Sequence, residues 1–533
     1  PKINQQGFQL TAAQLFEHQT IASLAAVATT SETVHAEQGE IVGNVSITPV
    51  QRKFLEQDHP AIQHYNHSVL LNVPANTNTN VLRRAISLLM NHHDALRTRF
   101  ELVASEWRQT IVSLNDGGVS FSEIDLSKSR EADRLVEFDR EVARLQASLG
   151  LAHGPLFRAT FFSFGEESPG RLLLIAHVLV ADRLSMATIV EDLNLAYQQL
   201  LQGTDVHLAE KTTSYQYWAS KLSEFADSPT ILEESSEWLN EARSTVADLP
   251  VDLPGGNNTV ESEVSISRSL EFEETKSLLE HATAVNHADI SELLLTAFVR
   301  SIGKWAANDK LLVDIEERGR EELFPEMNLS RTVGVFAATS PVLLQRLHLE
   351  DLNQTLPSVK EQVRRIPRHG IGYGLLRYLG EDLSLVAKLK SLPQAQIKFS
   401  YLGNLDQQSR TNDAIKPLTV PVAHSRDPRT GRSYFFEVST FIRDGKLEMN
   451  WIYSNALHKS ATANKLADEF IESVRELIAL STSTETERFS PSDFPLAGLD
   501  EKGLLELEYA LSAADHADDN TGDSSSQEPA AIA

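Results

Sequence analysis

The chain has 533 residues, of which 41% are hydrophobic and 23% charged, a balance typical of globular proteins with a substantial core. Its 48 Lys and Arg against 74 Asp and Glu give a formal charge of −26, which argues against nucleic acid and anionic membranes as partners. The sequence has no cysteine, so disulfides, thiolate nucleophiles and Cys-ligated metal sites are excluded. With neither a signal-peptide pattern nor the ~18–20 apolar residues of a membrane helix, we expect a cytoplasmic protein.

The N-terminal residues predict a short helical unit followed by a linker. Apolar residues recur at near-helical spacing over 8–28, with Thr11 as a favourable N-cap. A unit of this size cannot bury a core of its own, so we interpret residues 1–30 as the end of a larger domain. Residues 31–44 are polar and acidic, which is typical of a linker.

A first α/β block is predicted over residues 45–250. The β-prone run 69–73 ends before a proline and predicts a strand. Apolar residues between 81 and 90 share one face of a predicted helix, and the continuous apolar run 172–176 predicts a strand buried on both faces. Ser185 is the predicted N-cap of the helix that follows.

The Pro-, Gly- and Asn-rich segment 249–258 marks the main internal boundary. A second α/β block is predicted over 251–500, and the acidic, Ser-rich residues 501–533 predict a mostly disordered tail. The strongest elements of the second block are two predicted strands and a long final helix, at 397–401, 447–451 and 466–477.

A series of short motifs runs through both blocks. They are Thr48-Pro49-Val50-Gln51, His92-His93-Asp94-Ala95-Leu96-Arg97, Glu316-Glu317-Arg318-Gly319-Arg320-Glu321, Arg331-Thr332-Val333-Gly334, Gly370-Ile371-Gly372-Tyr373-Gly374 and Phe399-Ser400-Tyr401-Leu402-Gly403. This succession resembles the condensation superfamily of nonribosomal peptide synthetases, and most closely its epimerization domains. Residues 7–28 likewise resemble the last helix of a peptidyl carrier domain, whose phosphopantetheine-bearing Ser would lie upstream of residue 1. The resemblance therefore implies the upstream carrier as a partner and no cofactor held by this chain.

The resemblance also implies an α/β fold of two chloramphenicol-acetyltransferase-like subdomains arranged in a V, with a tunnel between them for carrier-bound substrate. The family's active-site motif is His-His-x-x-x-Asp-Gly, on the loop after a buried strand, and it matches residues 177–183. His177 and Asp182 keep the first His and the Asp. Val178 stands in place of the second His, the family's catalytic one, and Arg183 stands in place of the Gly.

The loss of this His matters because epimerization removes a proton from the α-carbon of a thioester and returns it to the other face, which needs a base with a pKa near the working pH. Valine can neither accept nor donate a proton, and losing such a group typically costs ~10²–10⁴ in rate. Ser400 and Met186 replace a further Asn and Trp of the family pattern. Its other catalytic group, a carboxylate, is kept as Glu316. We expect Arg183 to fill space in the tunnel and to pair with Glu316 or Glu317.

Several of these residues also have structural interpretations. We expect His177 to stabilise the structure rather than act as a base, and Asp182 to form an ion pair that holds its loop. His92 and His93 suggest a metal pair, but adjacent side chains on a helix diverge, so we expect no metal site. The glycines of 370–374 lack the strand-then-helix context of a phosphate loop.

Together the replacements predict a catalytically inactive member of the family, whose function is to bind a partner through its surface rather than to catalyse a reaction. In this superfamily, X domains recruit haem monooxygenases to glycopeptide assembly lines, and interface domains recruit non-haem iron hydroxylases in siderophore assembly lines. The resemblance thus implies a trans-acting oxygenase or hydroxylase as a partner. The modest Arg and Ala content favours the interface type.

The alternative is an atypical epimerization domain that converts an L- to a D-aminoacyl thioester with Glu316 as its base, alone or with Tyr401. Proton exchange through a single base is possible but slower. A designed inactive variant of an ordinary epimerase is a third possibility, but one designed change would not explain Arg183, Met186 and Ser400 together.

Overall fold

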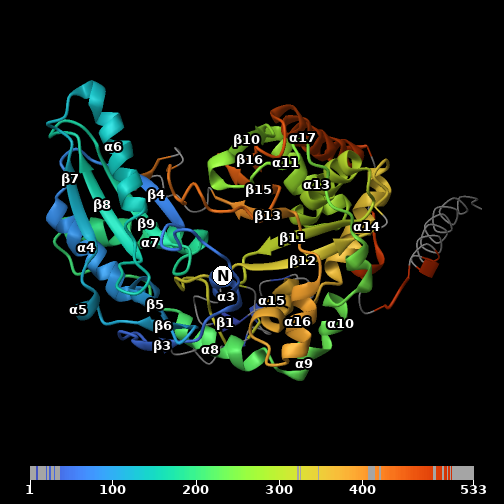
Figure 1. Ribbon diagram of the computed structural model, residues 1–533, viewed down its shortest axis with the longest axis horizontal. Coiled ribbons are helices and arrows are strands. Elements are labelled where there is room, and N and C mark those ends of the chain that lie inside the picture. The colour runs from blue at the N-terminus through green and yellow to red at the C-terminus, as the bar shows by residue number, and fades with distance from the viewer. Residues whose placement is uncertain are drawn as a thin grey trace, which may run out of the picture.

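The computed structural model describes residues 36–500, apart from 321–322, 325, 346, 406–414, 419–421, 484–487 and 495–496; outside that range it describes 8–9, 20, 23–25, 29–30, 502–503 and 506. Figure 1 shows two lobes that diverge from a common base, with the blue and cyan elements in one lobe and most of the green to red elements in the other. Among the described residues, no helix combines the length and apolar character needed to cross a membrane.

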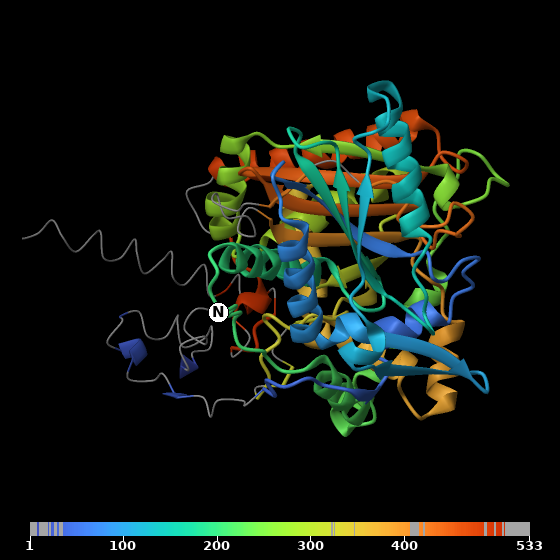
Figure 2. The same cartoon turned by 90° about the vertical axis from the view of Figure 1, so that its left-hand side faces the viewer.

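A five-stranded sheet of order β14-β4-β9-β8-β7 forms the centre of the N-terminal lobe, which Figure 2 shows from its outer side. Its strands are β4 (Asn66–Val73), β7 (Phe121–Asp125), β8 (Phe157–Ser163), β9 (Gly170–His177) and β14 (Lys416–Pro417). Both β4 and β8 pair antiparallel with β9. The central place of β9 accounts for its unbroken apolar run, because a strand covered on both faces buries every side chain.

Three long helices cover the two faces of this sheet. They are α4 (Thr79–His92), α6 (Glu131–Gln146) and α7 (Arg183–Leu201). Leu172 and Leu174 of β9 pack in the cluster with α4 and α7, whereas Leu173 and Ile175 pack in the cluster with α6. This division follows from the alternation of side chains along a strand. The lobe is completed by β3 (Gly43–Val45), β5 (Thr98–Val103), β6 (Glu106–Ile111), α5 (Leu114–Gly117) and η2 (Asp94–Arg97).

A six-stranded sheet of order β10-β16-β15-β13-β11-β12 forms the centre of the C-terminal lobe. Its strands are β10 (Glu263–Ser269), β11 (Leu311–Glu317), β12 (Ala338–Leu344), β13 (Ile397–Asn404), β15 (Phe436–Arg443) and β16 (Lys446–Ser454). β13 runs parallel to both β11 and β15, and the other neighbours are antiparallel. The largest buried cluster of the molecule joins this sheet to two long helices, α13 (Ile290–Ala306) and α17 (Ser460–Thr482).

Shorter helices surround this second core. They are η4 (Val260–Ser262), α11 (Phe272–Ser277), η5 (Leu278–Ala282), α12 (Thr283–Val285), α14 (Leu352–Arg364), η6 (Pro367–Gly370) and η8 (Pro491–Asp493).

The base that joins the lobes is built from both halves of the chain. Its helices are α3 (Pro49–Leu55), α8 (Tyr215–Phe225), α9 (Pro229–Glu233), α10 (Ser235–Trp238), η3 (Glu241–Thr245), α15 (Ile371–Tyr378) and α16 (Leu383–Ser391). Trp218 of α8 shares one buried cluster with Leu375 and Leu376 of α15. In the other direction, β14 pairs with β4, with Lys416 opposite Asn72. Segments from before and after residue 250 thus pack together, both in the base and in the N-terminal lobe. The predicted domain boundary near residue 250 therefore stays a prediction.

Most predicted elements are confirmed, since the runs at 69–73, 81–90, 172–176, 397–401, 447–451 and 466–477 lie in β4, α4, β9, β13, β16 and α17. The predicted N-cap is wrong: Asp182 caps α7, and its carboxylate accepts a hydrogen bond from the Ser185 amide at 2.7 Å. The carrier fragment and the tail, 1–30 and 501–533, lie mostly outside the described residues. Phe8, expected in a helical unit, belongs to the two-residue strand β1 (Phe8–Gln9), which pairs with β2 (Thr29–Thr30).

Candidate functional site

The motif at 177–183 lies where β9 ends and α7 begins, on the side of the N-terminal lobe that faces the C-terminal one. His177 is the last residue of β9 and pairs with Asn66 of β4. The Val178 amide then donates a hydrogen bond to the Tyr65 carbonyl at 3.0 Å. The Val178 side chain is partly exposed and offers only methyl groups at this place.

His177 is a fully buried, neutral imidazole with contacts at both ring nitrogens. The Leu179 amide donates to its Nδ1 at 3.2 Å, so Nε2 carries the proton and donates to the Ile62 carbonyl at 2.8 Å. The ring also packs edge-on against Phe54, with the centroids 5.7 Å apart. Burial lowers the pKa of His177 to about 4, although the bond to Ile62 opposes this shift. These contacts hold the end of β9 and leave neither nitrogen for a substrate.

Asp182 connects the motif loop to the C-terminal half of the chain. Its carboxylate caps α7 and also accepts hydrogen bonds from the Phe336 amide at 3.2 Å and from Arg320 at 3.2 and 3.3 Å. The Asp182 amide donates to the Gly334 carbonyl at 2.9 Å, and Arg320 lies over the Phe336 ring, 4.0 Å from its centroid. Because these hydrogen bonds occupy its lone pairs, the Asp182 carboxylate stabilises the structure and has no lone pair free for catalysis.

Arg183 occupies the first turn of α7, and its side chain is exposed. The Glu316 charge raises the pKa of the Arg183 guanidinium against the effect of desolvation, and Arg183 in turn helps to lower the pKa of Glu316. A direct contact of Arg183 with Glu316 or Glu317 stays a prediction. Arg183 therefore adds a positive charge near Glu316 at the junction of the lobes.

Glu316 is held in an ion pair by its neighbour strand. β11 and β13 are parallel with Glu316 opposite Ser400, and the Lys398 ammonium lies 3.4 Å from the Glu316 carboxylate. Lys398 lies equally close to Glu437, at 3.4 Å. The Lys398 charge holds the pKa of Glu316 below its usual value, against the effect of burial. A lower pKa makes this carboxylate a weaker base for a carbon acid.

Ser400 and Tyr401 lie on opposite faces of β13, because successive strand residues alternate. Ser400 shares the face of Glu316 and donates a hydrogen bond to the Ser439 hydroxyl at 3.3 Å. Tyr401 packs against the core on the other face, and it lines a cavity of about 250 Å³ that Glu316 and Phe399 also line. The strand register puts the Glu316 and Tyr401 side chains on opposite faces of the sheet, so an acid–base pair of the two stays a prediction.

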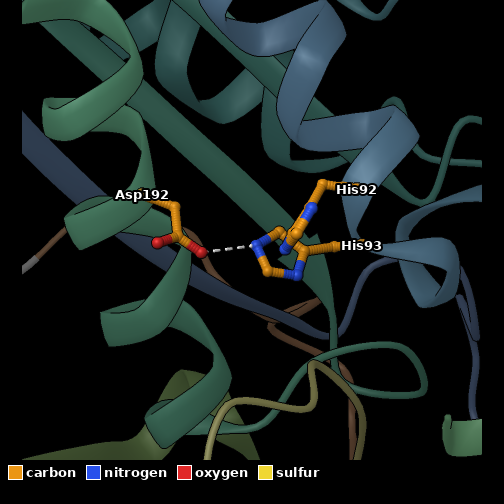
Figure 3. Close-up of side chains that lie close together, drawn as sticks. All are labelled: His92, His93 and Asp192. Carbon is orange, nitrogen blue, oxygen red and sulfur yellow. Dashed lines mark hydrogen bonds and ion pairs between the residues drawn. The ribbon is translucent and has the colours of Figure 1, made fainter. Parts of the chain in front are cut away.

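His92, His93 and Asp192 come together between α4 and α7 (Figure 3). The expected divergence of the two His side chains is wrong, because His93 lies just beyond the helix with φ −99° and ψ 91°, which brings the two ring centroids to 4.8 Å. The three ligand atoms lie within 4.8 Å of one another, but the Asp192 carboxylate is already bound to His93 at 2.9 Å and to Arg331. We therefore interpret the cluster as a link between the helices and the loop of Arg331.

His67 is the residue at this junction that the sequence did not single out. It lies on β4 opposite Ala176 and is partly exposed, and charged groups of both lobes act on it. Burial and the Arg183 cation lower the pKa of His67 to about 4, against the Asp182 and Glu316 carboxylates. No local motif marks this histidine; only the pairing of β4 with β9 shows where it lies.

This fold and this loop define a condensation-type domain. The chain belongs to the condensation domain family, whose model matches residues 41–497. A linear gramicidin synthase of Brevibacillus parabrevis is 37% identical over 511 residues, 94% of this chain and 7% of that protein. A surfactin synthase of Bacillus subtilis is 32% identical over 519 residues, 96% of this chain and 14% of that protein. The chain thus spans a small part of the length of these relatives.

Solved structures give the same fold. The epimerization domain from the third module of tyrocidine synthetase B superimposes with a TM-score of 0.77 and 29% identity, over 84% of this chain and 99% of that one. The X-domain from teicoplanin biosynthesis, in its complex with OxyB, superimposes with a TM-score of 0.63 and 18% identity, over 82% and 93%. The expected α/β fold of two chloramphenicol-acetyltransferase-like subdomains is confirmed, and the likeness to the X-domain concerns the fold alone.

Proposed function

We propose that this domain has no epimerization chemistry of its own and that it recruits a trans-acting oxygenase, a non-haem iron hydroxylase, to a residue on the upstream peptidyl carrier. The observation that carries the proposal is Val178: at the end of β9, where the family motif has its catalytic His, the chain offers an aliphatic side chain. Epimerization needs a group there that can take and return a proton.

The facing strand supports the same conclusion. Glu316 is the remaining family carboxylate, and Lys398 both pairs with it at 3.4 Å and lowers its pKa. Arg183 adds a second positive charge beside it. A carboxylate between two cations is stabilised in its charged form, so its proton affinity falls.

The recruitment proposal is supported by the parts of the family structure that this chain retains. Both large cores are intact, and the capping and interlobe bonds of Asp182 are complete although the neighbouring catalytic position is lost. The X-domain shares this fold and is known in a complex with OxyB. A preserved scaffold without its chemistry is best explained by a binding surface.

The test is a binding titration of the full chain, joined to its loaded upstream carrier, with each oxygenase encoded beside the parent synthetase. We expect one of them to bind, whereas the tyrocidine epimerization domain in the same format should not bind it. If every oxygenase fails to bind while the chain remains folded, the recruitment proposal is wrong.

The alternative epimerase is tested separately by solvent deuterium. A carrier-bound L-aminoacyl thioester is incubated with the chain in D₂O, and deuterium at the α-carbon is measured by mass spectrometry. We expect no incorporation above the uncatalysed background. Incorporation that is lost in Glu316→Gln would establish the alternative instead.

A further inference from the structure

Four consecutive strands of each central sheet have the same order and directions. In the N-terminal lobe, β4-β9-β8-β7 form two antiparallel pairs and then a parallel one, and β10-β16-β15-β13 repeat this pattern in the C-terminal lobe. β4 therefore corresponds to β10. The outer edge of β4 pairs with β14, an antiparallel strand from the other half of the chain. The sheet order gives β10 no such neighbour among the described residues, so the equivalent edge of the C-terminal lobe is open (Figure 1).

The backbone of β10 presents a row of hydrogen-bonding groups along this open edge. The Leu270 amide donates to the Leu447 carbonyl at 2.9 Å. At the other end, the Asn455 amide donates to the Ser262 carbonyl at 2.8 Å. The pairing with β16 between these bonds has no register shift, so the even-numbered residues of β10 bond to β16 and the odd-numbered ones direct their N–H and C=O groups outward. The outward residues are Glu263, Ser265, Ser267 and Ser269.

This edge lacks the usual protection against pairing with another chain, which is short length, proline, free charges or a covering element. β10 has seven residues without proline, and the three outward serines are exposed, small and uncharged. Its two charged residues already have partners, because Glu263 pairs with Arg432 at 3.4 Å and Arg268 with Asp468 of α17 at 2.6 Å. Arg268 also donates to the Ser267 carbonyl at 3.0 Å, which occupies one of the outward groups.

The other sheet edges of the described chain do have such protection. β1, β2, β3 and β14 have at most three residues each. β12 contains Pro341 and packs against α15. β7 exposes Glu123 and Asp125, and β5 exposes Glu101. The open edge of β10 is therefore an exception within this molecule.

We infer that β10 is a docking edge, at which an extended segment of a partner protein with Lys or Arg at its ends adds antiparallel to β10, as β14 does to β4. Exposed carboxylates flank the edge, since Glu261 precedes β10 and Glu273 follows it. A second copy of this chain is a poor occupant, because each copy has a formal charge of −26. This inference rests on the proposed function, because it names the surface that would hold the recruited oxygenase.

The first test uses a fluorescein-labelled peptide, Lys-Lys-Thr-Val-Thr-Val-Thr-Val-Lys-Lys, and measures its fluorescence anisotropy with the full chain at low salt. We expect saturable binding, and a peptide with Glu in place of every Lys should bind ~3–10-fold more weakly. A third peptide, N-methylated at adjacent central residues, cannot pair along either edge and should not bind. No binding of the Lys peptide, or equal binding of the N-methylated one, would overturn the inference.

Variants then place the binding at β10. Ser267→Pro removes an outward donor and leaves the bonds to β16 intact, because the Ser267 amide points away from β16. Ser267→Ala keeps the amide and is the matched control. We expect Ser267→Pro to lose ~10-fold in affinity for the Lys peptide and for the oxygenase, and Ser267→Ala to bind like the parent chain. Equal binding by the two variants would overturn the inference, and the N-methylated peptide tests the same point on the unaltered chain.

The remaining outcomes separate this inference from the proposed function. If the Lys peptide binds at β10 but every oxygenase fails to bind, the recruitment proposal is wrong and the docking edge is supported. If an oxygenase binds both variants equally, recruitment is supported and the docking edge is wrong. A dimer of the full chain that dissociates in Ser267→Pro would assign the edge to a second copy and overturn the inferred partner.

Discussion

At the scale of single residues, the motif at 177–183 retains the two residues that stabilise the structure, His177 and Asp182, and has Val178 in place of the family's catalytic His. His177 and Asp182 have complete sets of partners, which explains why both persist although Val178 cannot move a proton. The structure also separates residues that the motif pattern groups together. The cation in direct contact with Glu316 is Lys398, two residues before Ser400 on the neighbouring strand, and Arg183 acts on the same carboxylate through its charge.

Asp182→Ala should destabilise the protein markedly. It removes the α7 cap, worth ~1 kcal/mol, and leaves Arg320 without its carboxylate, for a total loss of about 3–5 kcal/mol. The measurement is the urea midpoint of unfolding. Asp205→Ala, at an exposed site, is the control and should leave the midpoint unchanged. Equal midpoints for both variants would contradict the structural role of Asp182.

Acid should destabilise the protein through its buried neutral histidines. The pKa of His177 is about 4 in the folded chain and ~6.5 when unfolded, so the folded state gains no proton as the pH falls through this window while the unfolded state does. Its stability contribution is therefore present above pH ~6.5 and falls by about 3 kcal/mol towards pH 4. Comparing unfolding midpoints at pH 7.5 and 5.0, we expect a smaller loss in His177→Gln than in the parent chain. An equal loss would show that His177 titrates normally.

At the scale of elements, hydrophobic periodicity was sufficient to predict the central strands and helices, since β9 and α4 have clear apolar patterns. It could not predict contacts that depend on pairing between distant segments. The two residues of β14 have no pattern of their own, and His67 reaches the site only through the register of β4 with β9. The helix cap was missed because Asp182 and Ser185 are both good N-caps, and the choice between them is made by Arg320 and Phe336 from the other half.

Besides its pairing with β4, the β14 crossing is held by one side chain of α7, and this contribution can be tested. Asn194 of α7 is buried and makes two hydrogen bonds to the Ile415 backbone, donating at 2.9 Å and accepting at 3.0 Å. Asn194→Ala should cost about 1–3 kcal/mol and increase hydrogen exchange at the amides of residues 415, 416 and 418. Asn80→Ala, an exposed change on α4, should not affect this segment. Unchanged exchange would mean that the strand pairing alone holds the crossing.

At the scale of the whole molecule, the two lobes form one assembly that shares a buried cluster at its base. Ion pairs also cross from α3 to the C-terminal half, where Lys53 lies 3.3 Å from Asp314 and Arg377 lies 2.9 Å from Glu56. The family motifs were sufficient to predict this architecture. They could not show which groups face one another across the junction, because that depends on how the lobes pack.

The central claim is that the replaced residues, rather than any defect of the fold, remove the epimerization chemistry. The most direct measurement is α-carbon deuterium incorporation into a carrier-bound L-aminoacyl thioester, compared between the parent chain and a triple variant, Val178→His with Arg183→Gly and Ser400→Asn. We expect the parent chain to remain at background, the triple variant to exchange its α-hydrogen, and the added change Glu316→Gln to abolish that gain. Exchange by the unaltered chain at the rate of an epimerization domain would contradict the claim.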